Sequence, residues 1–158
     1  MFQVGDKIVH PMHGAGVVED IVNNKINGVM REYYVLKLPV RAMLVMIPTS
    51  NCQEIGVRPV IGREEALCLM EQIPHLQTDV EQNWNRRYRE NMDRIKSGNL
   101  VEVAHVIKSL VERDKERGLS TGERKMLHSA KDILISELVL SLGSCSEEIE
   151  TELDRMLA

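Results

Sequence analysis

This chain of 158 residues has few aromatic residues and no cluster of cysteines. Aromatic residues make up 3% of it, so the core must be aliphatic, with the nine adaptable methionines helping to fill it. Its three cysteines, Cys52, Cys68 and Cys145, are widely spaced and include no Cys-x-x-Cys pair. This spacing argues against a disulfide framework or a zinc ribbon. We therefore expect reduced, mostly buried thiols.

Long apolar runs and an excess of positive charge are also missing. A membrane span needs roughly eighteen consecutive apolar residues, so we expect none here. Residues 1–6 lack a basic stretch leading into an apolar one, which predicts no secretory signal and a cytoplasmic protein. The formal net charge of −4 argues against bulk coating of nucleic acid, although a local basic patch is compatible with it.

The first 61 residues are rich in β-branched residues and punctuated by turns. Strands are predicted at 4–9, 17–22, 32–38 and 41–47. Asn27-Gly28 is a strong hairpin signal, because both residues tolerate a positive φ. Short strands with no room for helices predict a small antiparallel β-barrel over 1–61. An exposed strand edge could pair with a strand of a partner.

After a junction at 59–62, the apolar period changes to that of helices. Five helices with short connections predict an all-α domain over 62–158, and an α+β fold for the whole chain. The expected helices cover 63–73, 78 or 79 to 97, 99–117, 120–142 and 144–157. Capping signals open the last three, at Asn99 with Glu102, Ser120 with Glu123, and Ser144 with Glu147.

The second expected helix is basic and begins near the only tryptophan, Trp84. At 100° per residue, one face holds Val80, Trp84, Tyr88, Asn91 and Ile95, and the opposite face holds Arg86, Arg89 and Lys96. In one interpretation, Trp84 is a core residue and the arginines are a solvated face. In the other, the arginines bind phosphates and a partly exposed indole touches a base or a groove.

A second basic pair, Arg124 and Lys125, follows the predicted capping box. Cations at a helix N-terminus are unfavourable because they oppose the helix dipole. Together with the free backbone N–H groups, however, they could bind a phosphate. The other interpretation is a well-capped helical hairpin with surface ion pairs.

Catalytic and metal-binding signatures are not found. His10 and His13 could offer two metal ligands, but no third ligand is evident in the sequence, so a structural role is favoured. The chain has no nucleophile elbow, phosphate-binding loop or dinucleotide fingerprint. We expect a binding protein that is not an enzyme and that needs no metal or cofactor.

Four blocks recur in order along the chain: Phe2-x-Val4-Gly5-Asp6-x-x-Val9-x-Pro11-x-His13-Gly14-x-Gly16, Glu32-Tyr33-Tyr34-Val35-Leu36, Asn83-Trp84-x-Arg86-Arg87-Tyr88-Arg89-x-Asn91, and Arg113-Asp114-x-Glu116-Arg117-Gly118-Leu119-Ser120-x-Gly122-Glu123-x-x-Met126-Leu127. With these blocks the chain resembles the CarD/CdnL family of bacterial transcription regulators. The resemblance covers nearly the whole chain. The chain departs from the family at three positions. Asn24 and Met46 stand where some members have arginine, and His10 stands where tyrosine is usual.

The resemblance implies a Tudor-like (SH3-like) barrel that binds the β subunit of RNA polymerase. It further implies that the helices contact promoter DNA at the upstream fork of the melted −10 region, where Trp84 enters the minor groove and stabilises the open complex. The implied DNA-binding residues are Trp84, Arg86, Arg87, Arg89, Arg124 and Lys125. For polymerase binding, the candidates are Asn24, Lys25, Leu44, Val45, Met46 and Ile47. We expect a monomer associated with the nucleoid. The alternative is a general nucleoid-type DNA-binding protein that needs no polymerase and binds duplex DNA with a steep salt dependence.

Overall fold

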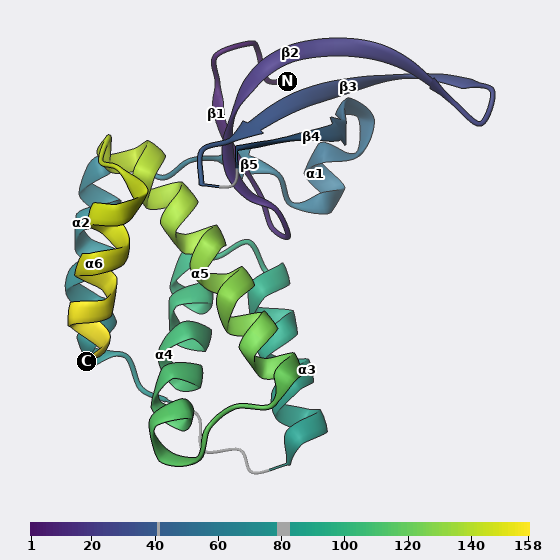
Figure 1. Ribbon diagram of the computed structural model, residues 1–158. Helices are drawn as coiled ribbons and strands as arrows, with labels where there is room; N and C mark the ends of the chain where they lie inside the picture. The colour runs from purple at the N-terminus through teal and green to yellow at the C-terminus, as the bar shows by residue number, and fades with distance from the viewer. Residues whose placement is uncertain (41, 79–82) are drawn as a thin grey trace.

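The computed structural model describes residues 1–40, 42–78 and 83–158, which form a sheet followed by a helical bundle (Figure 1). Within these residues, the five strands of the antiparallel sheet are ordered β4-β3-β2-β1-β5. The strands are β1 (Lys7–His10), β2 (Gly14–Ile26), β3 (Val29–Leu38), β4 (Met43–Pro48) and β5 (Arg58–Pro59). The predicted α+β class is confirmed, and β4 and β5 form the two edges of the sheet.

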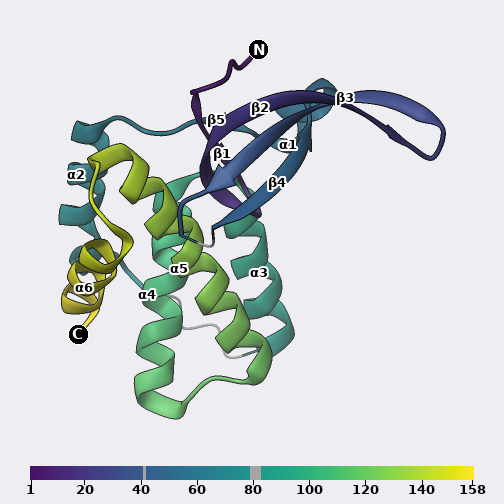
Figure 2. The same ribbon diagram turned by 45° about the horizontal axis from the view of Figure 1, so that its top comes forward.

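The β2–β3 hairpin is much longer than the sequence pattern predicts. Its turn is the expected one, because Asn27 and Gly28 both have positive φ values, 53° and 79°. The ladder continues to Ile26 opposite Val29, so polar residues of low strand propensity are held in β2 by pairing with β3. The hairpin extends well beyond the other strands, as Figures 1 and 2 show.

A short helical segment covers one end of the sheet. It comprises a 3₁₀ turn, η1 (Thr49–Asn51), and α1 (Cys52–Ile55). The expectation that this half has no room for helices is therefore wrong. Cys52 is buried in the sheet core, whereas Cys68 and Cys145 are exposed, so the prediction of mostly buried thiols holds for one cysteine of three.

Five α-helices follow the sheet in the described residues, as the apolar periodicity predicts. They are α2 (Arg63–Gln72), which continues into η2 (Ile73–His75), then α3 (Trp84–Lys96), α4 (Leu100–Arg117), α5 (Thr121–Leu142) and α6 (Ser146–Leu157). Asn99 and Ser120 cap α4 and α5 with their side chains, as expected. None of these helices combines the length and apolar character needed to cross a membrane.

Two predicted helix starts are wrong. α3 begins at Trp84 and is capped by Asn83, whose side chain accepts a hydrogen bond from the Arg86 N–H. The expected caps were Thr78, which precedes the helix, and Asp79, which lies outside the described residues, as does Val80. At α6 the N-cap position is occupied by Cys145 and not by Ser144, so the predicted capping box there does not form.

The sheet docks on the central helix α5. The backbone N–H of Ala15 in β2 donates to Ser136 Oγ at 2.9 Å. Gly14 has a φ of 92°, and a Cβ there would lie 2.7 Å from Ser136 Oγ, so only glycine fits this close approach.

A partly buried ion pair completes the docking. Arg58 in β5 donates to the fully buried Glu137 of α5 through Nη1 at 2.6 Å and Nη2 at 2.8 Å. The backbone N–H of Ile61 also donates to Glu137, at 3.0 Å. These contacts fix the orientation of the sheet relative to the helices.

Candidate nucleic-acid interface

Trp84 lies on the surface at the first turn of α3. Its side chain is 43% exposed and belongs to neither hydrophobic core. The indole stacks on Tyr88, with ring centroids 5.0 Å apart and planes at 19°. Its Nε1 donates to Ser120 Oγ at 3.2 Å, which joins the start of α3 to the start of α5. The interpretation of Trp84 as a core residue is therefore wrong.

Four exposed cations lie in the N-terminal halves of the same two helices. Arg86 and Arg89 are exposed on α3, and Arg124 and Lys125 are exposed in the first turn of α5. Arg86 Nε lies 3.7 Å from Glu90 Oε1, and Arg124 Nε donates to the Leu119 carbonyl at 3.2 Å. We call these four residues together with Trp84 the Trp84 surface. An exposed aromatic ring on helices that also carry exposed cations suits a nucleic-acid backbone with an accessible base step.

Arg87 does not belong to this surface, contrary to the role that the resemblance implied. It is 5% exposed, and its guanidinium donates to Glu123 through Nε at 2.8 Å and Nη2 at 3.2 Å. Burial alone would raise the pKa of Glu123, but the hydrogen bond and charge of Arg87, with the charge of Arg113, hold that pKa below its ordinary value. The pair is therefore ionised, and Arg87 is not available to phosphates.

The candidate polymerase-binding residues lie on the sheet. Asn24 and Lys25 are exposed near the end of the β2–β3 hairpin. In the edge strand β4, Leu44 and Met46 are 59% and 42% exposed, and Val45 is half-buried. Ile47 is 2% exposed and packs in the sheet core, so its side chain cannot meet a partner. Ile47 could therefore take part in strand pairing only through its backbone.

The structure adds exposed apolar residues that the sequence interpretation missed. Ile26, Val29 and Met30 are 46%, 51% and 66% exposed at the hairpin tip, and Met43 is 49% exposed in β4. The available signal was apolar side chains on both sides of Asn27-Gly28, at a turn where polar residues are usual. The exposed part of the sheet is thus more apolar than expected.

His10 and His13 come together, with ring centroids 4.5 Å apart. Burial and the neighbouring His13 lower the pKa of His10 to about 4. The Met12 N–H donates to His10 Nδ1 at 3.0 Å. Among the described residues, no three His, Cys, Asp or Glu side chains are grouped as metal ligands.

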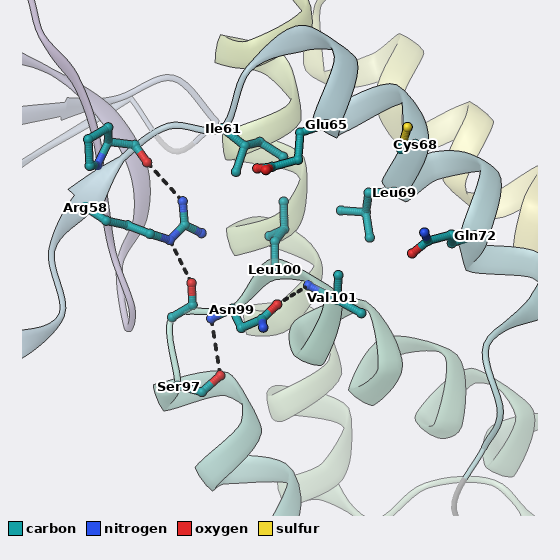
Figure 3. Close-up of a pocket in the computed structure, with 12 residues that line it drawn as sticks. Arg58, Ile61, Glu65, Cys68, Leu69, Gln72, Ser97, Asn99, Leu100 and Val101 are labelled. Atoms are coloured by element: carbon teal, nitrogen blue, oxygen red, sulfur yellow. Dashed lines mark hydrogen bonds between the residues drawn. The ribbon is translucent and has the colours of Figure 1, made fainter.

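A cavity of about 650 Å³ lies between β5, α2 and the α3–α4 turn (Figure 3). Its most prominent polar side chain is that of Arg58, which donates to Gly98 O at 2.7 Å and Pro59 O at 3.1 Å as well as to Glu137. The protein's own groups engage most of the N–H donors of this guanidinium, which favours a structural role for the cavity at the docking interface. The cavity is lined by other residues than the Trp84 surface.

Comparisons with known proteins match both parts of the chain. Residues 2–61 match the CarD-like/TRCF RID domain, and residues 69–154 match the CarD C-terminal domain. The chain is also 38% identical over 151 residues to the "Putative transcription factor YdeB" of Bacillus subtilis (strain 168), covering 96% of this chain and 99% of that protein.

Proposed function

Because the chain belongs to the CarD family of transcription regulators, we propose that it binds the β subunit of RNA polymerase and stabilises the open promoter complex. Residues 1–61 are the polymerase-binding part in this proposal, and residues 62–158 contact DNA. The observation that carries the proposal is the exposed indole of Trp84 at the start of α3, anchored on Ser120 at the start of α5. The Tudor-like sheet carries an exposed apolar edge in β4 that supports the protein contact.

The proposed DNA contact is a wedge at the upstream edge of the promoter bubble. Separating two stacked base pairs costs about a few kcal/mol per step, and an apolar side chain that replaces the lost stacking offsets that cost. Inserted into the minor groove at the fork, Trp84 would oppose closure of the bubble. The exposed Arg86 and Arg89 would fix the helix on the phosphates without reading sequence.

The proposed polymerase contact is strand pairing at β4. An edge strand presents unpaired backbone groups, and a strand of the partner can extend the sheet there. Exposed Leu44 and Met46 would add apolar contact beside that pairing. Attachment to polymerase raises the effective concentration of the Trp84 surface at the promoter, so a weak DNA contact suffices. A weak DNA contact that depends on attachment to polymerase is compatible with the net charge of −4.

Promoter binding is expected to depend on polymerase. The protein alone should bind a promoter duplex with a dissociation constant weaker than about 1 µM at physiological salt, the range of non-specific contacts. With cognate polymerase it should protect the upstream edge of the bubble. Fluorescence anisotropy of labelled duplex measures the affinity of the protein alone, and footprinting of the ternary complex measures the protection. Tight duplex binding without polymerase, with a steep salt dependence, would instead indicate the general nucleoid-type protein.

A further inference from the structure

We propose that Ser120, supported by the Arg87–Glu123 ion pair, is a positioning residue that holds the indole of Trp84 in one orientation. This inference rests on the proposed function, because the orientation matters for entry of the ring into DNA. It gives Arg87 and Glu123 a role through Ser120 in place of a direct contact with DNA.

The indole is restrained at several points although much of it is exposed. One face stacks on Tyr88, and Nε1 is hydrogen-bonded to Ser120 Oγ. Gly122 lies beside the edges of both rings, since a Cβ there would be 3.7 Å from both Trp84 Cζ2 and Tyr88 Cε2. Stacking on Tyr88 alone would still allow the ring to slide, whereas the Nε1 bond fixes its rotation within the stack.

The Ser120 hydroxyl is saturated in a way that sets its direction. A serine hydroxyl offers one donor and two acceptor positions. Ser120 Oγ accepts the Glu123 N–H at 3.2 Å and the Trp84 Nε1–H at 3.2 Å, and it donates to Glu123 Oε1 at 3.4 Å. With its proton directed to the carboxylate, the oxygen presents a lone pair to the indole.

The carboxylate that receives this proton is itself immobile. Glu123 is 2% exposed and binds Arg87 through both carboxylate oxygens. Arg113 Nε lies 3.9 Å from Glu123 Oε1 and adds a second positive charge. The arrangement thus runs from a buried ion pair through Ser120 to the exposed indole, and it links α3 to α5.

Such restraint prepares the ring for binding. A surface tryptophan that samples several rotamers loses that freedom when it enters DNA, and this loss weakens binding. An indole already fixed on Tyr88 and Ser120 has less freedom to lose. Removing the Ser120 hydroxyl should therefore reduce the increase in open-complex lifetime by about two- to tenfold, which is the effect expected from the loss of one neutral hydrogen bond.

The test uses Ser120→Gly, Ser120→Thr and Asn99→Gly. Glycine is tolerated at an N-cap, so Ser120→Gly removes the hydroxyl with little loss of helix stability. Ser120→Thr keeps a hydroxyl at this position. Asn99→Gly is the matched control, because it removes the N-cap of α4, which follows the far end of α3 from Trp84. Time-resolved anisotropy and acrylamide quenching report on Trp84 alone, since the chain has one tryptophan.

We expect Ser120→Gly to increase the fast anisotropy component and the quenching of Trp84 at least about twofold, and to shorten open-complex lifetime within the range given above. Ser120→Thr and Asn99→Gly should behave like the wild type in both assays. Unchanged tryptophan motion in Ser120→Gly, or increased motion with an unchanged lifetime while Trp84→Ala shortens the lifetime, overturns the inference. Trp84→Ala is assayed in parallel: if it also leaves the lifetime unchanged, the proposed function fails, while the anisotropy still decides whether Ser120 holds the ring.

Discussion

Replacing Glu137 with alanine is expected to lower the free energy of unfolding by about 2–4 kcal/mol, because it removes two charge-assisted hydrogen bonds to Arg58 at the docking interface. Glu137 has no exposed surface and accepts from both terminal nitrogens of Arg58. Glu137 also accepts a hydrogen bond from the backbone N–H of Ile61, and the change would remove this bond. Urea denaturation followed by circular dichroism measures the effect.

Glu148→Ala is the matched control for this change. Glu148 is an exposed glutamate in the first turn of α6, so its loss should alter stability by no more than about 0.5 kcal/mol. A loss below about 1 kcal/mol for Glu137→Ala would mean that the ion pair with Arg58 does not hold the sheet on α5.

The second large effect is expected at the edge strand β4. Introducing aspartate at both Leu44 and Met46 should weaken binding to core RNA polymerase at least about 100-fold, because each carboxylate would be buried unpaired against the partner. Both side chains are exposed in the unbound protein, so the change should leave its stability nearly intact. Biolayer interferometry with immobilised core polymerase measures the affinity.

Leu67→Asp provides the comparison for this variant. Leu67 is 45% exposed on α2 and so resembles Leu44 in exposure, but it lies outside the sheet. Its replacement should leave polymerase affinity unchanged. If the double variant at β4 binds as tightly as the wild type, the polymerase contact lies elsewhere.

Local signals in the sequence were sufficient for most elements. Asn27-Gly28 determined the hairpin turn, and Asn99 and Ser120 marked two helix starts, because turn and cap chemistry depends on a few adjacent residues. The short α1 and β5 were missed, since four and two residues are too few to display a period.

The candidate site was less predictable, because burial depends on neighbours distant in sequence. Arg87, Asn91 and Ile95 are the buried residues of α3, at a spacing of four. This spacing could have placed Arg87 inside, but its partner Glu123 lies on another helix. Trp84 lies on nearly the same face, one turn earlier, where the start of α5 covers only part of the ring.

The candidate segment 44–47 combines side chains of two kinds. Side chains of a strand alternate between its faces, so a continuous segment includes both exposed and buried ones. In the structure Leu44 and Met46 are exposed, whereas Ile47 points into the sheet core. Alternation alone would have separated these residues.

The most direct test of the central proposal is the lifetime of the open promoter complex formed with cognate RNA polymerase. The wild-type protein should prolong that lifetime, and Trp84→Ala, with unchanged polymerase affinity and stability, should lose most of the gain. The exposed indole is the group whose stacking opposes bubble closure in this proposal. Equal prolongation by the wild type and Trp84→Ala would contradict it.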